Sequence, residues 1–146
     1  MELQNHINPL TDITSYFKKN NFKVNSYKNL KIISYHYDSP PEYNNKDDIW
    51  KLYLKGAVIN KDNKIICLPP IKSFTMNNEL ENDNLSFEHL IDGTMINLFH
   101  YQNEWLISTR SEIGGYNKWT NKKSFRQMFD ECSHLDYDIL NKNMSY

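Results

Sequence analysis

The side chains that could bind a metal or act as nucleophiles are scattered through this sequence. Cys132 and His134 lie two positions apart, but no second Cys/His pair completes a zinc-binding set. The sequence has no G-x-S-x-G motif of serine hydrolases, and its four glycines form no glycine-rich phosphate loop. The carboxylates of Glu79, Glu81 and Asp83 lie in a polar run, which is typical of a solvated loop. One ordered set of short segments remains in which chemistry could occur.

These four segments lie at or beside expected strands. They are KGAVI at 55–59, CLPPIKSF at 67–74, LIDGTMI at 90–96 and ISTRS at 107–111. In this order, over roughly residues 50–135, they resemble the N-terminal part of the bacteriophage-type RNA ligases, members of the covalent nucleotidyltransferase superfamily. That family has R-G before an apolar run, then P-F-x-K-F-F-N, the nucleophile motif K-x-D-G-S and a strand ending T-K-G-S. The segment DGTMIN is also similar to ligase-like proteins of large DNA viruses, which implies a viral protein.

The resemblance implies a nucleotide- or RNA-binding role for five residues. Lys55 takes the place of the arginine in R-G, which keeps the charge but makes a poorer bidentate clamp for a phosphate group. Lys72 matches the lysine of P-F-x-K, and Arg110 matches the basic residue of T-K-G-S. Asp92 and Gly93 match the Asp-Gly pair of the nucleophile motif.

Leu90 occupies the position of the lysine that, in this family, attacks the α-phosphate of ATP. A leucine side chain has no amine and forms no phosphoramidate with AMP. Its neighbours His89 and Ile91 supply no amine either. We therefore predict no catalytic residue and no metal site. The resemblance implies ATP and Mg²⁺ as cofactors only for a chain in which ligase-like activity remains.

Three functions are compatible with these residues. The first is a degenerate RNA-ligase-like protein, a pseudoenzyme that retains nucleotide or RNA-end binding. The second is a non-catalytic interaction or scaffold protein whose open sheet edge pairs with a protein partner or a second copy. The third is an RNA ligase fragment in which Lys72 has become the nucleophile. Each residue also has a structural interpretation, because Asp92-Gly93 is a common turn, Lys72 could be solvated and Arg110 could form an ion pair.

The spacing of apolar residues predicts two helices and several antiparallel strands. One helix, capped by Asn8, begins at Pro9 and continues through Phe17. A second begins at Ser124, and we expect it to bury Phe125, Met128, Phe129 and Leu135. Strands are predicted over residues 31–37, 50–59, 64–68, 86–91, 94–99 and 105–109. The fold class is therefore α+β, with antiparallel sheets and flanking helices. The resemblance implies part of a ligase-type nucleotidyltransferase fold, unrelated to ATP-grasp.

The chain is 146 residues long, which predicts a single domain over residues 1–146. By the resemblance, this RNA-ligase-like domain is truncated before the later ligase motifs, so its sheet has an unpaired edge that favours self-association or a partner.

With 17 basic and 18 acidic residues, the net charge of −1 excludes a basic field over the whole surface but allows a local patch. Two cysteines, no signal peptide and no apolar run of ~20 residues predict a cytoplasmic protein that does not enter a membrane.

Overall fold

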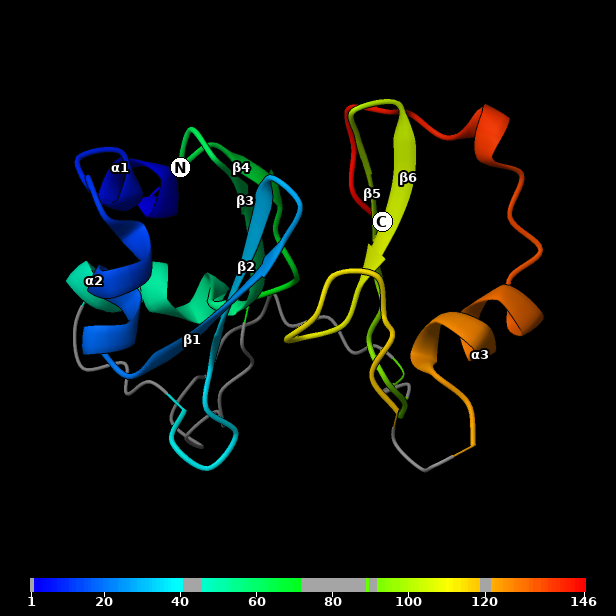
Figure 1. Cartoon of the computed structure of the whole chain (residues 1–146), viewed down its shortest axis with the longest axis horizontal. Helices are drawn as coiled ribbons and strands as arrows, with labels where there is room; N and C mark the ends of the chain where they lie inside the picture. Colours follow the sequence, from blue (N-terminus) through cyan, green and yellow to red (C-terminus); the bar gives the residue numbers. More distant parts are fainter. Residues whose placement is uncertain (1, 41–45, 72–88, 90–91, 119–121) are drawn as a thin grey trace, which may run out of the picture.

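The computed structural model describes residues 2–40, 46–71, 89, 92–118 and 122–146. Two antiparallel sheets and flanking helices make up this part of the chain, so the predicted α+β class is confirmed (Figure 1). The helices are α1 (Glu2–Ile7), α2 (Ile13–Lys19) and α3 (Phe125–Cys132), with 3₁₀ helices η1 (Lys46–Tyr53) and η2 (Tyr137–Ile139). The strands are β1 (Phe22–Tyr27), β2 (Leu30–Tyr35), β3 (Lys55–Asn60), β4 (Ile65–Cys67), β5 (Asn97–Tyr101) and β6 (Glu104–Ser108). Within these ranges, no helix is long and apolar enough to cross a membrane.

The two middle strands of the four-stranded sheet, β2 and β3, are buried on both faces. The strands of this sheet lie in the order β1-β2-β3-β4, each antiparallel to the next. Because successive side chains of a strand point to opposite faces, Ala57 and Ile59 of β3 join one apolar cluster and Val58 joins the other. Burial on both faces explains why residues 56–59 read as a continuous apolar run rather than as an alternating one.

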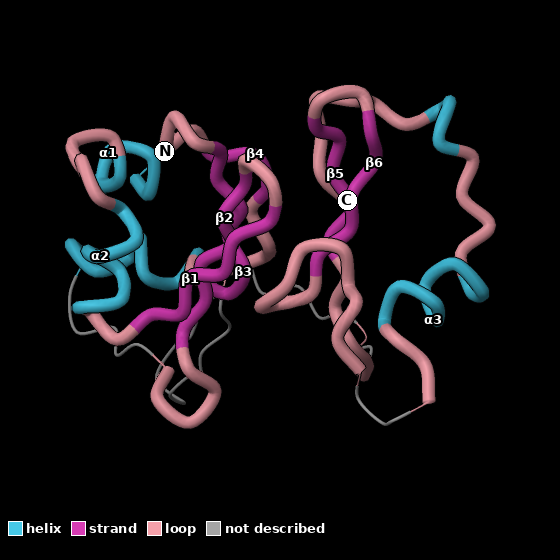
Figure 2. The backbone as a smooth tube through the Cα atoms, viewed as in Figure 1, coloured by secondary structure: helices cyan, strands magenta, loops and turns pink. Residues whose placement is uncertain are grey.

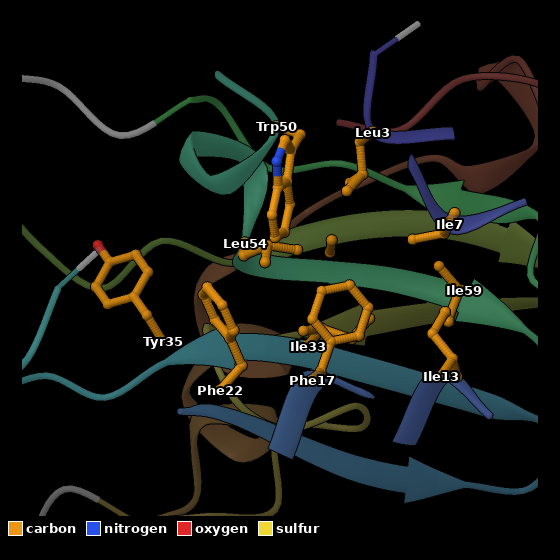
Figure 3. Packing of buried hydrophobic residues seen from close by; sticks show 11 residues of the cluster. Leu3, Ile7, Ile13, Phe17, Phe22, Ile33, Tyr35, Trp50, Leu54 and Ile59 are labelled. Atoms are coloured by element: carbon orange, nitrogen blue, oxygen red, sulfur yellow. The ribbon is translucent and has the colours of Figure 1, made fainter. Parts of the chain in front are cut away.

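The first apolar cluster lies between this sheet and the N-terminal helices (Figure 3). Phe17 of α2 is fully buried and meets the ring of Phe22 edge-on, with 5.8 Å between the ring centroids. Ile7 of α1 and Trp50 of η1 complete the layer over the sheet. The N-terminal helices are thus held on the sheet by their buried apolar side chains.

The second apolar cluster lies between the two sheets. The four-stranded sheet, the hairpin of β5 and β6 and the segment after β6 together supply its buried residues, which are Leu30, Ile32, Val58, Cys67, Phe99, Leu106 and Ile113. The β5–β6 hairpin therefore packs on the face of the large sheet that the helices leave uncovered (Figure 2). This packing sets the relative position of β3 and β6, whose ends form the candidate site.

The β5–β6 hairpin carries further backbone partners on both sides. Its two-residue turn, Gln102-Asn103, has φ values of 47° and 67°, as a type I′ turn requires. The N–H and C=O of Leu98 bond the backbone of Tyr146 at 2.7 and 2.8 Å. On the other side, the N–H of Gly114 donates to the carbonyl of Ile107 at 2.7 Å. Both outer sides of the hairpin are thus partly paired, by the C-terminal residue and by the segment after β6. The pairing of an open sheet edge with a partner stays a prediction.

Several local predictions hold and others are wrong. The hairpin of residues 55–59 and 64–68 is confirmed, whereas residues 50–53 belong to η1 rather than to a strand. The buried Trp50 and Leu54 fit the alternating pattern of a strand. They are buried here because helices and sheet enclose this connection from several sides. The first predicted helix is wrong at its start, because α2 is capped by Asp12, whose side chain accepts from the N–H of Ser15. Strand β1 was not predicted, and the expected strand over 86–91 lies outside the described residues except for position 89.

Helix α3 begins at the predicted residue. Ser124 accepts a hydrogen bond from the N–H of Gln127, whose side chain accepts one from the N–H of Ser124. The expected burial is wrong, because no residue of α3 is buried and Leu135, beyond its end, is 44% exposed. The start of α3 bonds the backbone of the segment after β6, at Gly115 and Asn117, and the apolar side chains of the helix stay partly exposed.

Candidate functional site

An open cleft of about 430 Å³ lies where the segments following β2 and β6 meet the start of β3. Three cationic side chains line it, those of Lys55, Arg110 and Lys118. Tyr37 and Gly93 also contribute to its wall. No acidic side chain is among the described residues that line the cleft, so it concentrates positive charge in a chain whose net charge is −1. We refer to it as the cationic cleft.

Gly56 explains why Lys55 and Arg110 lie at the same cleft. Its φ is +120°, and a Cβ atom at this position would lie 3.0 Å from the backbone oxygen of Arg110. A glycine lets the two backbones approach closely and adopts this φ without strain. The Lys-Gly pair at the start of β3 therefore has a packing role beside any role in binding.

Arg110 is held by two tyrosine rings. Its guanidinium carbon lies 5.4 Å from the ring centroid of Tyr35 and 5.3 Å from that of Tyr37. Tyr35 is buried, whereas Tyr37 is 78% exposed. In the described part of the chain Arg110 has no carboxylate partner, so the ion pair considered for it is not found there. Cation–π contacts orient the guanidinium and leave its N–H groups able to donate to a ligand.

Lys118 reaches the cleft from the segment that precedes α3. This segment is fixed by backbone hydrogen bonds, since the N–H of Phe125 donates to the carbonyl of Asn117 at 3.1 Å and the N–H of Arg126 donates to Gly115 at 2.8 Å. Lys118 itself forms an isolated β-bridge with Ser124. The backbone that carries Lys118 is thus fixed by hydrogen bonds to the first residues of α3.

The structure brings together three of the five residues that the resemblance selected. Lys55, Gly93 and Arg110 line the cationic cleft. Asp92 is exposed beside Gly93 and is not among the residues lining the cleft. Lys72 lies outside the described residues, as does Leu90.

Sequence reasoning missed Tyr37 and Lys118. Tyr37 is two positions after Tyr35 in the predicted strand over 31–37, and side chains two positions apart share one face of a strand, which was a usable signal. Lys118 lies in a polar segment with no motif, and only the folding of that segment onto α3 brings it to the cleft.

The described residues contain no group of three His, Cys, Asp or Glu side chains that could hold a metal ion. Of the two cysteines, Cys67 is buried, and burial raises the pKa of its thiol to about 11. A thiol with this pKa carries almost no thiolate at neutral pH, so Cys67 is not an activated nucleophile. At the cationic cleft itself, three cationic side chains are suited to bind anions.

Comparisons with known proteins assign no family. No family model matches the chain, and neither a curated protein nor a solved structure matches it. The resemblance to the RNA ligases therefore stays a prediction, and functional reasoning rests on the geometry of the cleft.

Proposed function

We propose that this chain binds the phosphate groups of a nucleotide or of an RNA end in the cationic cleft. The observation that supports this most strongly is the gathering of Lys55, Arg110 and Lys118 around one cleft. The proposal retains the predicted degenerate RNA-ligase-like protein, whose bound groups are those that ATP or an RNA terminus would present.

The three cationic side chains would contact a phosphate group in different ways. Arg110 has a planar fork of N–H donors that matches two phosphate oxygens, and two tyrosines already hold it in place. Lys55 and Lys118 would act as point charges on either side. Hydrogen bonds to charged groups contribute about 1.5–3 kcal/mol each, so three such contacts are sufficient for a measurable affinity.

Tyr37 gives the cleft an exposed aromatic ring, which could contact the base of a nucleotide. Its ring is 78% exposed and lies against Arg110. Base stacking on an aromatic ring is worth about 1–3 kcal/mol per base and tolerates every base. A nucleotide with its base on Tyr37 would place its phosphate groups within reach of Arg110.

Charge-neutralising variants test the proposal. We expect Arg110→Gln and Lys118→Gln each to weaken AMP and pyrophosphate binding by about tenfold in calorimetry. Lys61→Gln is the matched control, because Lys61 is exposed in the β3–β4 turn outside the cleft. For an RNA ligand, two to three phosphate contacts predict a slope of log K against log salt of about −2 to −3. Equal losses in all three variants, or none in any, would contradict the proposal.

Binding without catalysis is the second part of the proposal. Because Leu90 has no amine, we predict that incubation with ATP and Mg²⁺ yields no covalent AMP adduct in intact-mass spectrometry. An adduct that disappears in Lys72→Ala would instead support the ligase fragment with a relocated nucleophile.

A second candidate function is pairing with a protein partner or a second copy through a sheet edge. Strand β1 favours it, because this six-residue strand is an outer strand of the four-stranded sheet. One side of an outer strand has backbone groups that its own sheet does not pair. Light scattering on the purified chain should then show a concentration-dependent dimer, and a monomer at high concentration would contradict this candidate.

A further inference from the structure

A second cleft of about 420 Å³ adjoins the cationic cleft. Its lining comes from β1 and from the segment after β6, and consists of Asn25, Ser26, Ser111, Glu112 and Asn117. Every one of these side chains is polar, and none is cationic. Ser111 and Asn117 line both clefts, so the two are contiguous. We refer to the second one as the polar cleft.

The wall of the polar cleft is fixed by hydrogen bonds that span distant parts of the sequence. The side-chain amide of Asn25 on β1 donates to the backbone carbonyl of Ser111 at 2.8 Å. The backbone N–H of Thr109 donates to the carbonyl of Glu112 at 2.9 Å. These hydrogen bonds hold the segment after β6 against β1 and fix the backbone that lines the cleft.

Glu112 presents a carboxylate of known orientation. Its Oε2 accepts a hydrogen bond from the backbone N–H of Asn117 at 2.6 Å. Among the described residues, Oε1 accepts no hydrogen bond and Glu112 has no cationic partner. A carboxylate held by one oxygen, in a cleft without a cation, is suited to accept from neutral O–H donors.

The two clefts therefore favour different groups of one ligand. The cationic cleft attracts phosphate, whereas a phosphate in the polar cleft would meet the charge of Glu112. A sugar with adjacent hydroxyls has the complementary chemistry, and acidic side chains of dinucleotide-binding folds accept from a ribose 2′-OH in this way.

We propose that the polar cleft binds the vicinal hydroxyls of a ribose, so that the ligand is a ribonucleotide or the diol-bearing end of an RNA rather than a deoxynucleotide. This inference rests on the proposed phosphate-binding function of the neighbouring cleft. Glu112 accepts from a ribose hydroxyl through Oε1, and the side chains of Asn25 and Asn117 lie around the same sugar.

Comparing sugars in the unmodified chain gives the first test. Calorimetry with AMP, 2′-deoxy-AMP and 2′,3′-dideoxy-AMP should show binding of the dideoxy compound about tenfold or more weakly than AMP, because the carboxylate loses its O–H donors. A short RNA with a free 2′,3′-diol, compared with its 2′,3′-dideoxy-terminated form, separates an RNA end from a free nucleotide as the source of the diol.

Glu112→Gln gives the second test. The glutamine oxygen still accepts from the N–H of Asn117, so the wall keeps its hydrogen bond while the charge is removed. We expect discrimination between AMP and 2′,3′-dideoxy-AMP to fall below about threefold, with pyrophosphate binding unchanged or stronger. Glu131→Gln, an exposed residue paired with Lys123, is the matched control and should retain full discrimination.

The outcomes separate the two proposals. If AMP and 2′,3′-dideoxy-AMP bind equally to the unmodified chain while Arg110→Gln weakens both, the ribose inference is overturned and phosphate binding stands. If no phosphate compound binds, both are overturned. The sugar comparison uses the unmodified chain, so it tests the inference even if Glu112→Gln does not fold.

Discussion

The four-stranded sheet is covered on both faces, whereas the chain from α3 to the C-terminus contains no buried residue. Both regions carry the same signal in the sequence, apolar side chains at a regular spacing. In the N-terminal region the apolar faces of α1, α2 and η1 meet a wide sheet. In the C-terminal region no residue of α3 is buried, and Figure 1 shows α3 apart from the four-stranded sheet. Spacing identifies a helix and its apolar face, but the surface opposite decides whether that face is buried.

The C-terminal region is held by sparse contacts instead of a core. Trp105 on the hairpin lies 6.0 Å from the ring of Tyr137 and 6.3 Å from that of Tyr146, measured between centroids. The cationic cleft takes Tyr37 and Lys55 from the first region, whereas Arg110 and Lys118 come from the segment between β6 and α3. A ligand that bridges these parts of the chain should stabilise the folded state against unfolding.

Phe17→Ala should show the largest effect and separates the two regions most clearly. Phe17 is fully buried between α2 and the sheet, so we expect a loss of about 3–5 kcal/mol in the free energy of unfolding. The matched change in α3 is Phe129→Ala, which should cost about 1 kcal/mol because that side chain is only half-buried. Urea denaturation measures both, and equal losses would mean that α3 is packed as tightly as α2.

Gly56→Ala tests the point where β3 meets the segment after β6. The added methyl group would lie 3.0 Å from the Arg110 oxygen at a φ of +120°, so we expect a loss of about 1–3 kcal/mol in stability. Because Arg110 must shift, pyrophosphate binding should weaken as well. Lys55→Gln is the comparison, since it should weaken binding while leaving the urea midpoint unchanged. Normal stability and binding in Gly56→Ala would show that the close approach is unimportant.

His6 gives a smaller, pH-dependent effect that is confined to the N-terminal region. Its ring stacks on Trp50 at 3.8 Å and its Nε2 lies 2.8 Å from the hydroxyl of Tyr16. Burial and then the charge of Lys51 lower the pKa of this imidazole from its ordinary value. The unfolded chain therefore takes up the proton first as the pH falls below about 6.5, so stability present at neutral pH is lost on acidification.

Urea midpoints and Trp50 fluorescence between about pH 7.5 and about pH 5 measure this effect. His6→Gln keeps a hydrogen-bonding side chain but does not titrate, so its midpoint should change less over this interval. An identical pH dependence in both proteins would show that other groups cause it.

Local features could be predicted from the sequence because neighbouring residues determine them. The Ser124 cap of α3 needs only Gln127 three positions later, and the β3–β4 hairpin follows from apolar runs around a polar turn. The strand assigned to residues 50–53 failed because a short alternating run also fits a 3₁₀ helix when several elements surround it. Of the site, the motif order selected Lys55, Gly93 and Arg110, but it did not indicate Tyr37 or Lys118.

By itself, the sequence determined the α+β class, the absence of a lysine at position 90 and a charge balance that permits only a local basic patch. Only the tertiary structure decided where that patch lies. Lys55 is 55 positions before Arg110 and 63 before Lys118, and it meets them through the contact at Gly56 and the packing of the hairpin on the large sheet. The polar cleft is likewise a tertiary product, since Asn25 and Ser111 are 86 positions apart and a hydrogen bond joins them. Residue spacing encodes local periodicity, whereas long-range proximity depends on which apolar faces cover one another.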